Sequence, residues 1–153
     1  MTSRHGFPKG IPMRDIAFVF FLAAVLCVTG GMIWGLQMAA SGDHTMVGAH
    51  AHLNLVGWAT MALFGIYYRL TPQAAHGWLP RIHAALAIPG VLVMVPGIAL
   101  ASTGGSPGLA IAGSFLTFGS MAVFLFTVSR HGFGAADTSR RPGLTGAALT
   151  PAE

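Results

Sequence analysis

The chain has 153 residues, of which 54% are hydrophobic and only 8% are charged. A soluble domain carries about 25% charged residues, so this composition excludes an ordinary soluble domain. The formal net charge is +4 at pH 7, and the single cysteine, Cys27, excludes an intramolecular disulfide framework and a zinc–thiolate cluster.

Four apolar segments are each long enough to cross a bilayer, which takes about 20 helical residues. Each is predicted to be a helix, because backbone groups in lipid must be hydrogen-bonded within their own segment. The loops between them are short, so successive helices should be antiparallel neighbours. The sequence therefore predicts an all-α membrane protein, a four-helix transmembrane bundle with helices at about 16–38, 45–70, 82–101 and 109–128, between flexible cytoplasmic tails at 1–15 and 129–153.

The basic residues all fall on one side of this topology. They precede the first predicted helix, flank the loop between the second and third, or follow the fourth: Arg4, Lys9, Arg14, Arg69, Arg81, Arg130, Arg140 and Arg141. By the positive-inside rule, both termini are predicted to be cytoplasmic in a multi-pass protein of the plasma (inner) membrane. Because this charge pattern accounts for orientation, we expect no nucleic-acid partner.

The first predicted helix carries two glycines, Gly31 and Gly35, on one face. Small residues at this spacing let the backbones of membrane helices approach closely. We therefore expect another helix to pack tightly against this part of the first one.

The second predicted helix contains the segment HAHLNLVGW, His50 to Trp58, which places two imidazoles and an amide in an apolar stretch. Polar groups in a bilayer are costly and usually face a bundle interior, a partner or a cofactor.

Successive helical residues are rotated by about 100°, so His50 and His52 should point to nearly opposite sides of the helix. The two rings are then not expected to chelate one ion, and each should serve its own pocket. The side of His50 is predicted to include Asn54, Gly57 and Met61, and that of His52 to include Val56, Ala59 and Leu63.

Ligation of a haem or a metal would satisfy both rings, since the other membrane segments offer few polar partners. The candidate metal ligands are therefore His50 and His52. Asn54 is a further candidate for cofactor binding, and Gly57 and Trp58 would let a flat macrocycle approach and pack beside the helix. The alternative is a non-catalytic membrane subunit whose histidines only pack or respond to pH.

A second alternative is a copper-binding or copper-trafficking protein. His44 and Met46 lie in the first loop, and Asp43 and the two helix histidines are near them in the sequence. Imidazole and thioether groups both suit copper. A loop histidine near the lipid headgroups explains His44 equally well, so its role stays open.

His83 lies just after Arg81, at the start of the third predicted helix. Helices two and three run in opposite directions, which separates His83 from His52 by roughly 20 Å along the membrane normal. The two histidines therefore cannot ligate one metal within one subunit, and the sequence leaves the role of His83 open.

The segment HAHLNLVGWATMALFGIYYRL, His50 to Leu70, resembles a helix of subunit I of the haem-copper oxidase and nitric oxide reductase superfamily. In that family, subunit I has twelve helices in three four-helix arcs, and the second helix of the third arc carries an H-x-H that serves two haems. The resemblance implies that His50 and His52 ligate b-type haem, for electron transfer in a cytochrome-like protein. It does not imply oxidase activity, because this chain lacks the adjacent His-His pair and the histidine–tyrosine arrangement of the oxidase copper centre.

The resemblance and the helix geometry together predict a homotrimer, in which three copies reproduce a twelve-helix assembly. His50 of one subunit would face His52 of the next, as a cyclic, heterologous interface requires, with one haem at each interface. The expected partners are the lipid bilayer and a redox partner or quinol.

Overall fold

The structure is a computed structural model and describes residues 15–135. All regular structure in this range is helical, which confirms the predicted all-α class. Three of the helices are long and apolar enough to cross a membrane, and many of their large apolar side chains are exposed, as in a membrane protein. These three helices are α1 (Ile16–Ser41), α4 (Leu79–Ser102) and α5 (Gly108–His131).

The second predicted helix is helical throughout but is not one regular α-helix. Its parts follow one another without a break: α2 (Val47–His52), the π-helix η1 (Leu53–Thr60) and α3 (Met61–Leu70). Each part is shorter than a membrane span when taken alone. A helix is therefore present over most of the predicted range 45–70, with a π-helical middle third directly after His52, and no single α-helix of membrane-spanning length is found there. π-helices are rare and are frequent at functional sites.

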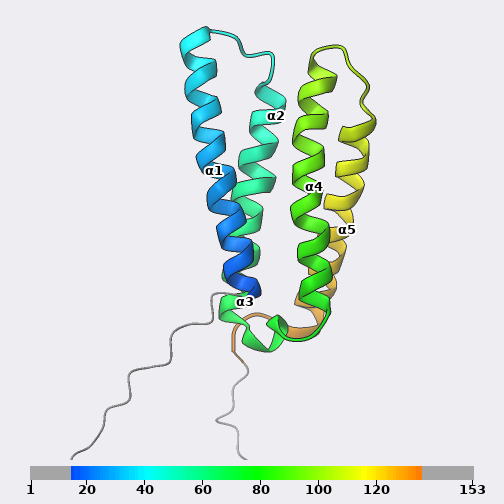
Figure 1. The fold of residues 1–153 in the computed structure, drawn as a ribbon. Coiled ribbons are helices and arrows are strands. Elements are labelled where there is room, and N and C mark those ends of the chain that lie inside the picture. The colour runs from blue at the N-terminus through cyan, green and yellow to red at the C-terminus, as the bar shows by residue number, and fades with distance from the viewer. Residues whose placement is uncertain (1–14, 136–153) are drawn as a thin grey trace, which may run out of the picture.

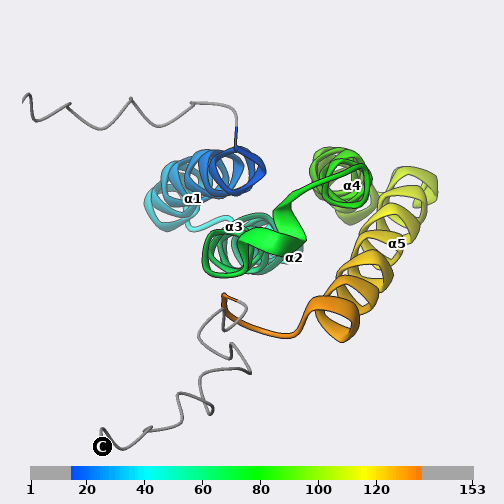
Figure 2. The same cartoon turned by 90° about the horizontal axis from the view of Figure 1, so that it is seen from below.

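The helical segments run alternately up and down and form a curved row (Figures 1 and 2). α1 packs mainly on the second helical segment, and α5 packs mainly on α4. Seen from the end, α1 and α5 lie at the two edges of the row, with α3 and α4 between them (Figure 2). The start of α1 and the end of α5 lie at the same end of the molecule (Figure 1).

Both ends of α1 are capped. A carboxylate oxygen of Asp15 accepts a hydrogen bond from the backbone N–H of Ala17 and caps the first turn. At the other end, Gly42 adopts the left-handed conformation, with φ 69°, and its N–H donates to the carbonyl of Met38. The helix therefore extends three residues beyond the predicted end.

α5 also runs past its predicted end, and the chain then turns back at Gly132, where φ is 68°. The hydroxyl of Tyr67 donates to the carbonyl of Gly132 over 2.8 Å, and the N–H of Gly134 donates to Oγ1 of Thr71 over 3.0 Å. These bonds tie residues 132–134 to α3 and to the 3-10 helix η2 (Pro72–Ala75). Residues 129–134, predicted to belong to a flexible tail, therefore continue α5 or bond to the bundle, and the rest of the two predicted tails lies outside the described residues.

Candidate functional site

The two histidines of the HAHLNLVGW segment leave the helix on different sides. The His50 ring is half-buried against α1, where a Cβ placed on Gly35 would lie 3.1 Å from Cε1 of His50. The ring of Trp34 meets the same imidazole edge-on, with the ring centroids 6.4 Å apart. His52 is exposed, and its Nδ1 lies 2.8 Å from the carbonyl oxygen of Gly48. The divergence expected from the helical rotation is therefore present in the structure.

The hydrogen bond of His52 fixes which ring nitrogen is free. A carbonyl oxygen only accepts, so Nδ1 of His52 carries the hydrogen and donates it to Gly48. In the neutral ring, Nε2 then keeps its lone pair, which is the usual state of a metal-ligating histidine. The neighbouring surface is apolar and open, since Leu55, three positions further along the helix, is 65% exposed. Nε2 of this imidazole is therefore available to bind a metal ion.

Asn54 and the two glycines of α1 form the surroundings of His50. The Asn54 amide donates to the backbone carbonyl of His50 over 2.9 Å, whereas it lies 3.3 Å and 3.5 Å from the two ring nitrogens. Both ring contacts are longer than an ordinary N–H hydrogen bond, so among the described residues neither nitrogen of His50 has a short one. A Cβ on Gly31 would meet the Asn54 amide at 2.5 Å. The second helical segment therefore packs closely on α1 at Gly31 and Gly35, as their spacing predicted. The two glycines leave room for the side chains of Asn54 and His50.

Gly57 and Trp58 have packing roles in this structure. Gly57 is buried, and a Cβ there would lie 2.9 Å from Sγ of Cys27 and 3.2 Å from Cγ1 of Val91. Its missing side chain therefore lets α1 and α4 pack against η1. Trp58 is half-buried against the hydrophobic core. Neither residue is gathered around His50 or His52.

The π-helix changes which residues share a side with His52. A residue in a π-helix bonds five positions back, so each residue turns by less than the 100° of an α-helix. Val56, expected beside the exposed His52, is half-buried and lines a cavity of 140 Å³ with residues of α4 and α5. The hydroxyl of Thr60 donates to the carbonyl of Leu55, five positions back, over 2.8 Å. No residue pattern in the sequence marked this change.

The polar side chains of the first loop form hydrogen bonds within the loop. One carboxylate oxygen of Asp43 accepts hydrogen bonds from the backbone N–H and the hydroxyl of Thr45, which lower the pKa of Asp43. His44 bonds through Nδ1 to the carbonyl of Gly42 over 3.0 Å. Within residues 15–135, no three His, Cys, Asp or Glu side chains are grouped to hold a metal ion.

His83 lies in the core, although its position in the sequence placed it near the membrane boundary. Its side chain is completely buried, and Nδ1 is hydrogen-bonded to the hydroxyl of Tyr68 over 2.9 Å. The other nitrogen, Nε2, has no partner among the described residues. Aromatic rings from three helices pack around the His83 ring, with centroid-to-centroid distances between 4.4 and 5.4 Å: Phe20, Phe64 and Phe124.

The contacts with α1 show how far His83 is from the candidate ligands. His83 packs on Phe20, whereas His50 packs on Gly35. At 1.5 Å per residue, these two positions of α1 are roughly 22 Å apart. The two histidine sites therefore lie at different depths, as the topology predicted.

Comparisons of the chain with protein-family models, with curated proteins and with solved structures found no match. A functional proposal must therefore be based on the chemistry and placement of the chain's own residues. The strongest basis is the opposed placement of His50 and His52.

Proposed function

We propose that this chain is a small integral-membrane haem protein, related to one four-helix arc of haem-copper oxidase subunit I. His50 and His52 would supply axial ligands to b-type haem for electron transfer. The observation that carries the proposal is that one helix presents two imidazoles on different sides, and that His52 is exposed with Nδ1 occupied and Nε2 free.

The residues present fit such a group. The exposed apolar surface around His52 suits the hydrophobic edge of a porphyrin, and its bonded Nδ1 fixes the ring for ligation through Nε2. His50 has no short hydrogen bond to its ring among residues 15–135, so ligation would give it a strong partner. A haem held by His50 and His52 would supply a one-electron couple suited to electron transfer.

In this proposal the continuous helical segment from Val47 to Leu70 is the fourth membrane span. The described arginines, Arg69, Arg81 and Arg130, belong to the ends of helices on the side where residue 15 also lies. By the positive-inside rule, this side is cytoplasmic, and the protein lies in the plasma membrane with both termini inside.

We further propose a homotrimer. The four helical segments form an open row, and α5 at its edge exposes large apolar side chains, including Phe115 and Phe118, each 73% exposed. A row with two different edges favours a heterologous contact, which closes into a ring when the rotation allows. Three copies would place His52 of each subunit toward its neighbour, with a redox partner or quinol exchanging electrons at the membrane surface.

The test is an optical spectrum of the purified full chain after expression with ample haem. We expect a Soret band and sharp α and β bands on reduction, and their loss in both His50→Ala and His52→Ala. His44→Ala is the matched control, because it removes an imidazole that bonds within the first loop, and it should keep the spectrum. A colourless wild type, or bands unchanged in both helix variants, would overturn the proposal, and copper without porphyrin would favour the copper alternative.

A further inference from the structure

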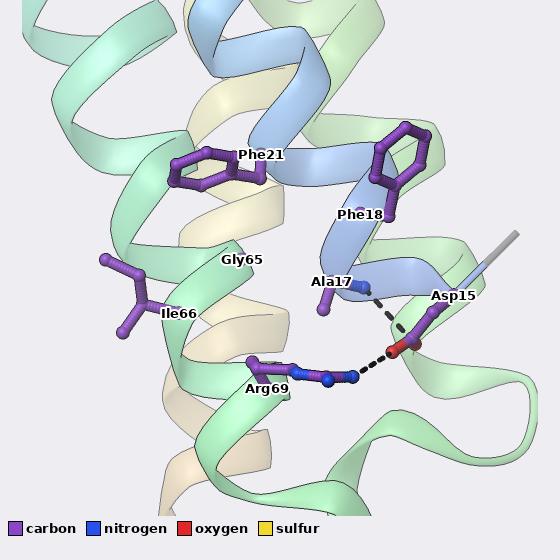
Figure 3. A pocket seen from close by; sticks show the side chains of 7 residues that line it. All are labelled: Asp15, Ala17, Phe18, Phe21, Gly65, Ile66 and Arg69. Atoms are coloured by element: carbon purple, nitrogen blue, oxygen red, sulfur yellow. Dashed lines mark hydrogen bonds and ion pairs between the residues drawn. The ribbon is translucent and has the colours of Figure 1, made fainter. Parts of the chain in front are cut away.

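Two hollows meet at the arginine-bearing end of the molecule, and both are lined by Asp15 and Arg69. The first is an apolar groove of 310 Å³ between α1 and α3 (Figure 3). The second is a polar hollow of 530 Å³, where the start of α1, the end of α3, η2 and the start of α4 come together. Neither hollow includes a residue of the proposed haem site.

The groove is open on the side that faces lipid. Its walls are the side chains of Phe18, Phe21 and Ile66, which are between 43% and 45% exposed (Figure 3). Its floor is formed where Gly65 brings α3 close to α1, since a Cβ there would lie 3.0 Å from the carbonyl oxygen of Ala17. Only its end is charged, where the guanidinium of Arg69 reaches toward Asp15 (Figure 3).

The polar hollow has an excess of positive charge and free hydrogen-bond donors. Arg69 and Asp15 form a long ion pair of 3.7 Å, and the Arg69 side chain is 65% exposed. Arg81, on the same hollow, forms no ion pair within residues 15–135. The free donors belong to the two guanidinium groups, since His76 already donates its Nδ1–H to the carbonyl of Pro72 over 2.7 Å.

We propose that the two hollows together bind one anionic phospholipid. Its phosphate would be held by Arg81 and Arg69, because guanidinium groups bind phosphate through charge-assisted hydrogen bonds. One acyl chain would lie in the apolar groove, which joins the polar hollow at Arg69. Basic pockets between membrane helices on the cytoplasmic side are typical sites for anionic headgroups. The direct junction of a basic hollow with an apolar groove favours a lipid over a free phosphate ion.

The test is native mass spectrometry of the detergent-solubilised full chain, titrated with dioleoyl phosphatidylglycerol or with dioleoyl phosphatidylcholine. We expect one bound phosphatidylglycerol, at least about tenfold tighter than phosphatidylcholine, a difference of about 1.4 kcal/mol. The variant carrying both Arg69→Gln and Arg81→Gln should lose this preference. Arg130→Gln is the control, since it removes a positive charge from the end of α5, outside both hollows, and should keep the preference.

A second pair of variants tests the acyl-chain part. Ile66→Trp fills the groove and should weaken phosphatidylglycerol binding about tenfold, whereas Leu63→Trp, on the same helix but outside the groove, should not. An equal loss in Arg130→Gln would show general charge attraction and overturn the site. Inorganic phosphate that displaces the lipid at millimolar concentration, with Ile66→Trp without effect, would overturn the lipid in favour of a simple anion.

Discussion

Tyr68 and His83 are joined by a side-chain hydrogen bond, 2.9 Å from the hydroxyl oxygen to Nδ1, at a place where both are almost fully buried. Aromatic rings from α1, α3 and α5 pack around the pair, and Nε2 of His83 is left without a partner among the described residues. A buried polar group without a partner costs free energy, so this pair depends on the one bond that it makes.

Removal of the Tyr68 hydroxyl should therefore destabilise the protein more than removal of the whole pair. We expect Tyr68→Phe to lower the free energy of unfolding by about 1–3 kcal/mol, because both nitrogens of His83 are then unpartnered. The double variant Tyr68→Phe with His83→Leu should regain most of this loss. Denaturant unfolding in detergent measures four proteins: the wild type, Tyr68→Phe, His83→Leu and the double variant. If the loss in the double variant equals the sum of the two single losses, the coupling is contradicted.

A second prediction concerns the seam between α4 and α5. A Cβ on Gly113 would collide with the backbone of Met94, including its Cα at 2.5 Å, which cannot move aside as a side-chain tip can. Gly113→Ala should cost about 1–3 kcal/mol of stability, as overpacking does. Gly119→Ala in the same helix meets its nearest neighbour, Leu86, only at 3.8 Å and should be tolerated. Equal melting temperatures for the two variants would contradict this packing.

The first loop gives a prediction about pH. Hydrogen bonds from the hydroxyl and the N–H of Thr45 lower the pKa of Asp43 in the folded protein. A lowered pKa stabilises the folded loop above the ordinary aspartate pKa, and this stabilisation is lost as the pH falls through the lowered value. An NMR titration should find the pKa of Asp43 below its ordinary range, and Thr45→Val should raise it. An unchanged titration in Thr45→Val would show that the hydroxyl bond does not form in solution.

The general design was predictable because it depends on local patterns. Runs of apolar residues predicted the helices, and a rotation of about 100° per residue predicted that His50 and His52 diverge. The π-helix was not predictable, because the change in hydrogen bonding after His52 leaves the hydrophobic pattern unaltered. The burial of His83 was missed because it depends on Phe20 and Phe124, which reach it from helices distant in the sequence.

The last prediction separates a haem within one subunit from a haem shared between two. If each site takes His50 from one chain and His52 from the next, a His52→Ala chain still offers His50 and a His50→Ala chain still offers His52. Each variant alone should lack the bis-histidine spectrum. Co-expression of the two should restore it at about a quarter of the interfaces, since one of four ordered pairings has both ligands.

The matched control is co-expression of His50→Ala with the double variant His50→Ala/His52→Ala, in which no interface has both ligands. Reduced-minus-oxidised spectra of the purified complexes, scaled to protein, measure the recovery. A mixture of the two single variants that stays as colourless as this control would reject the shared site. That result would leave haem binding by the wild type intact. A site that takes both histidines from one chain is broken in each single variant, and a neighbouring chain cannot supply the missing histidine.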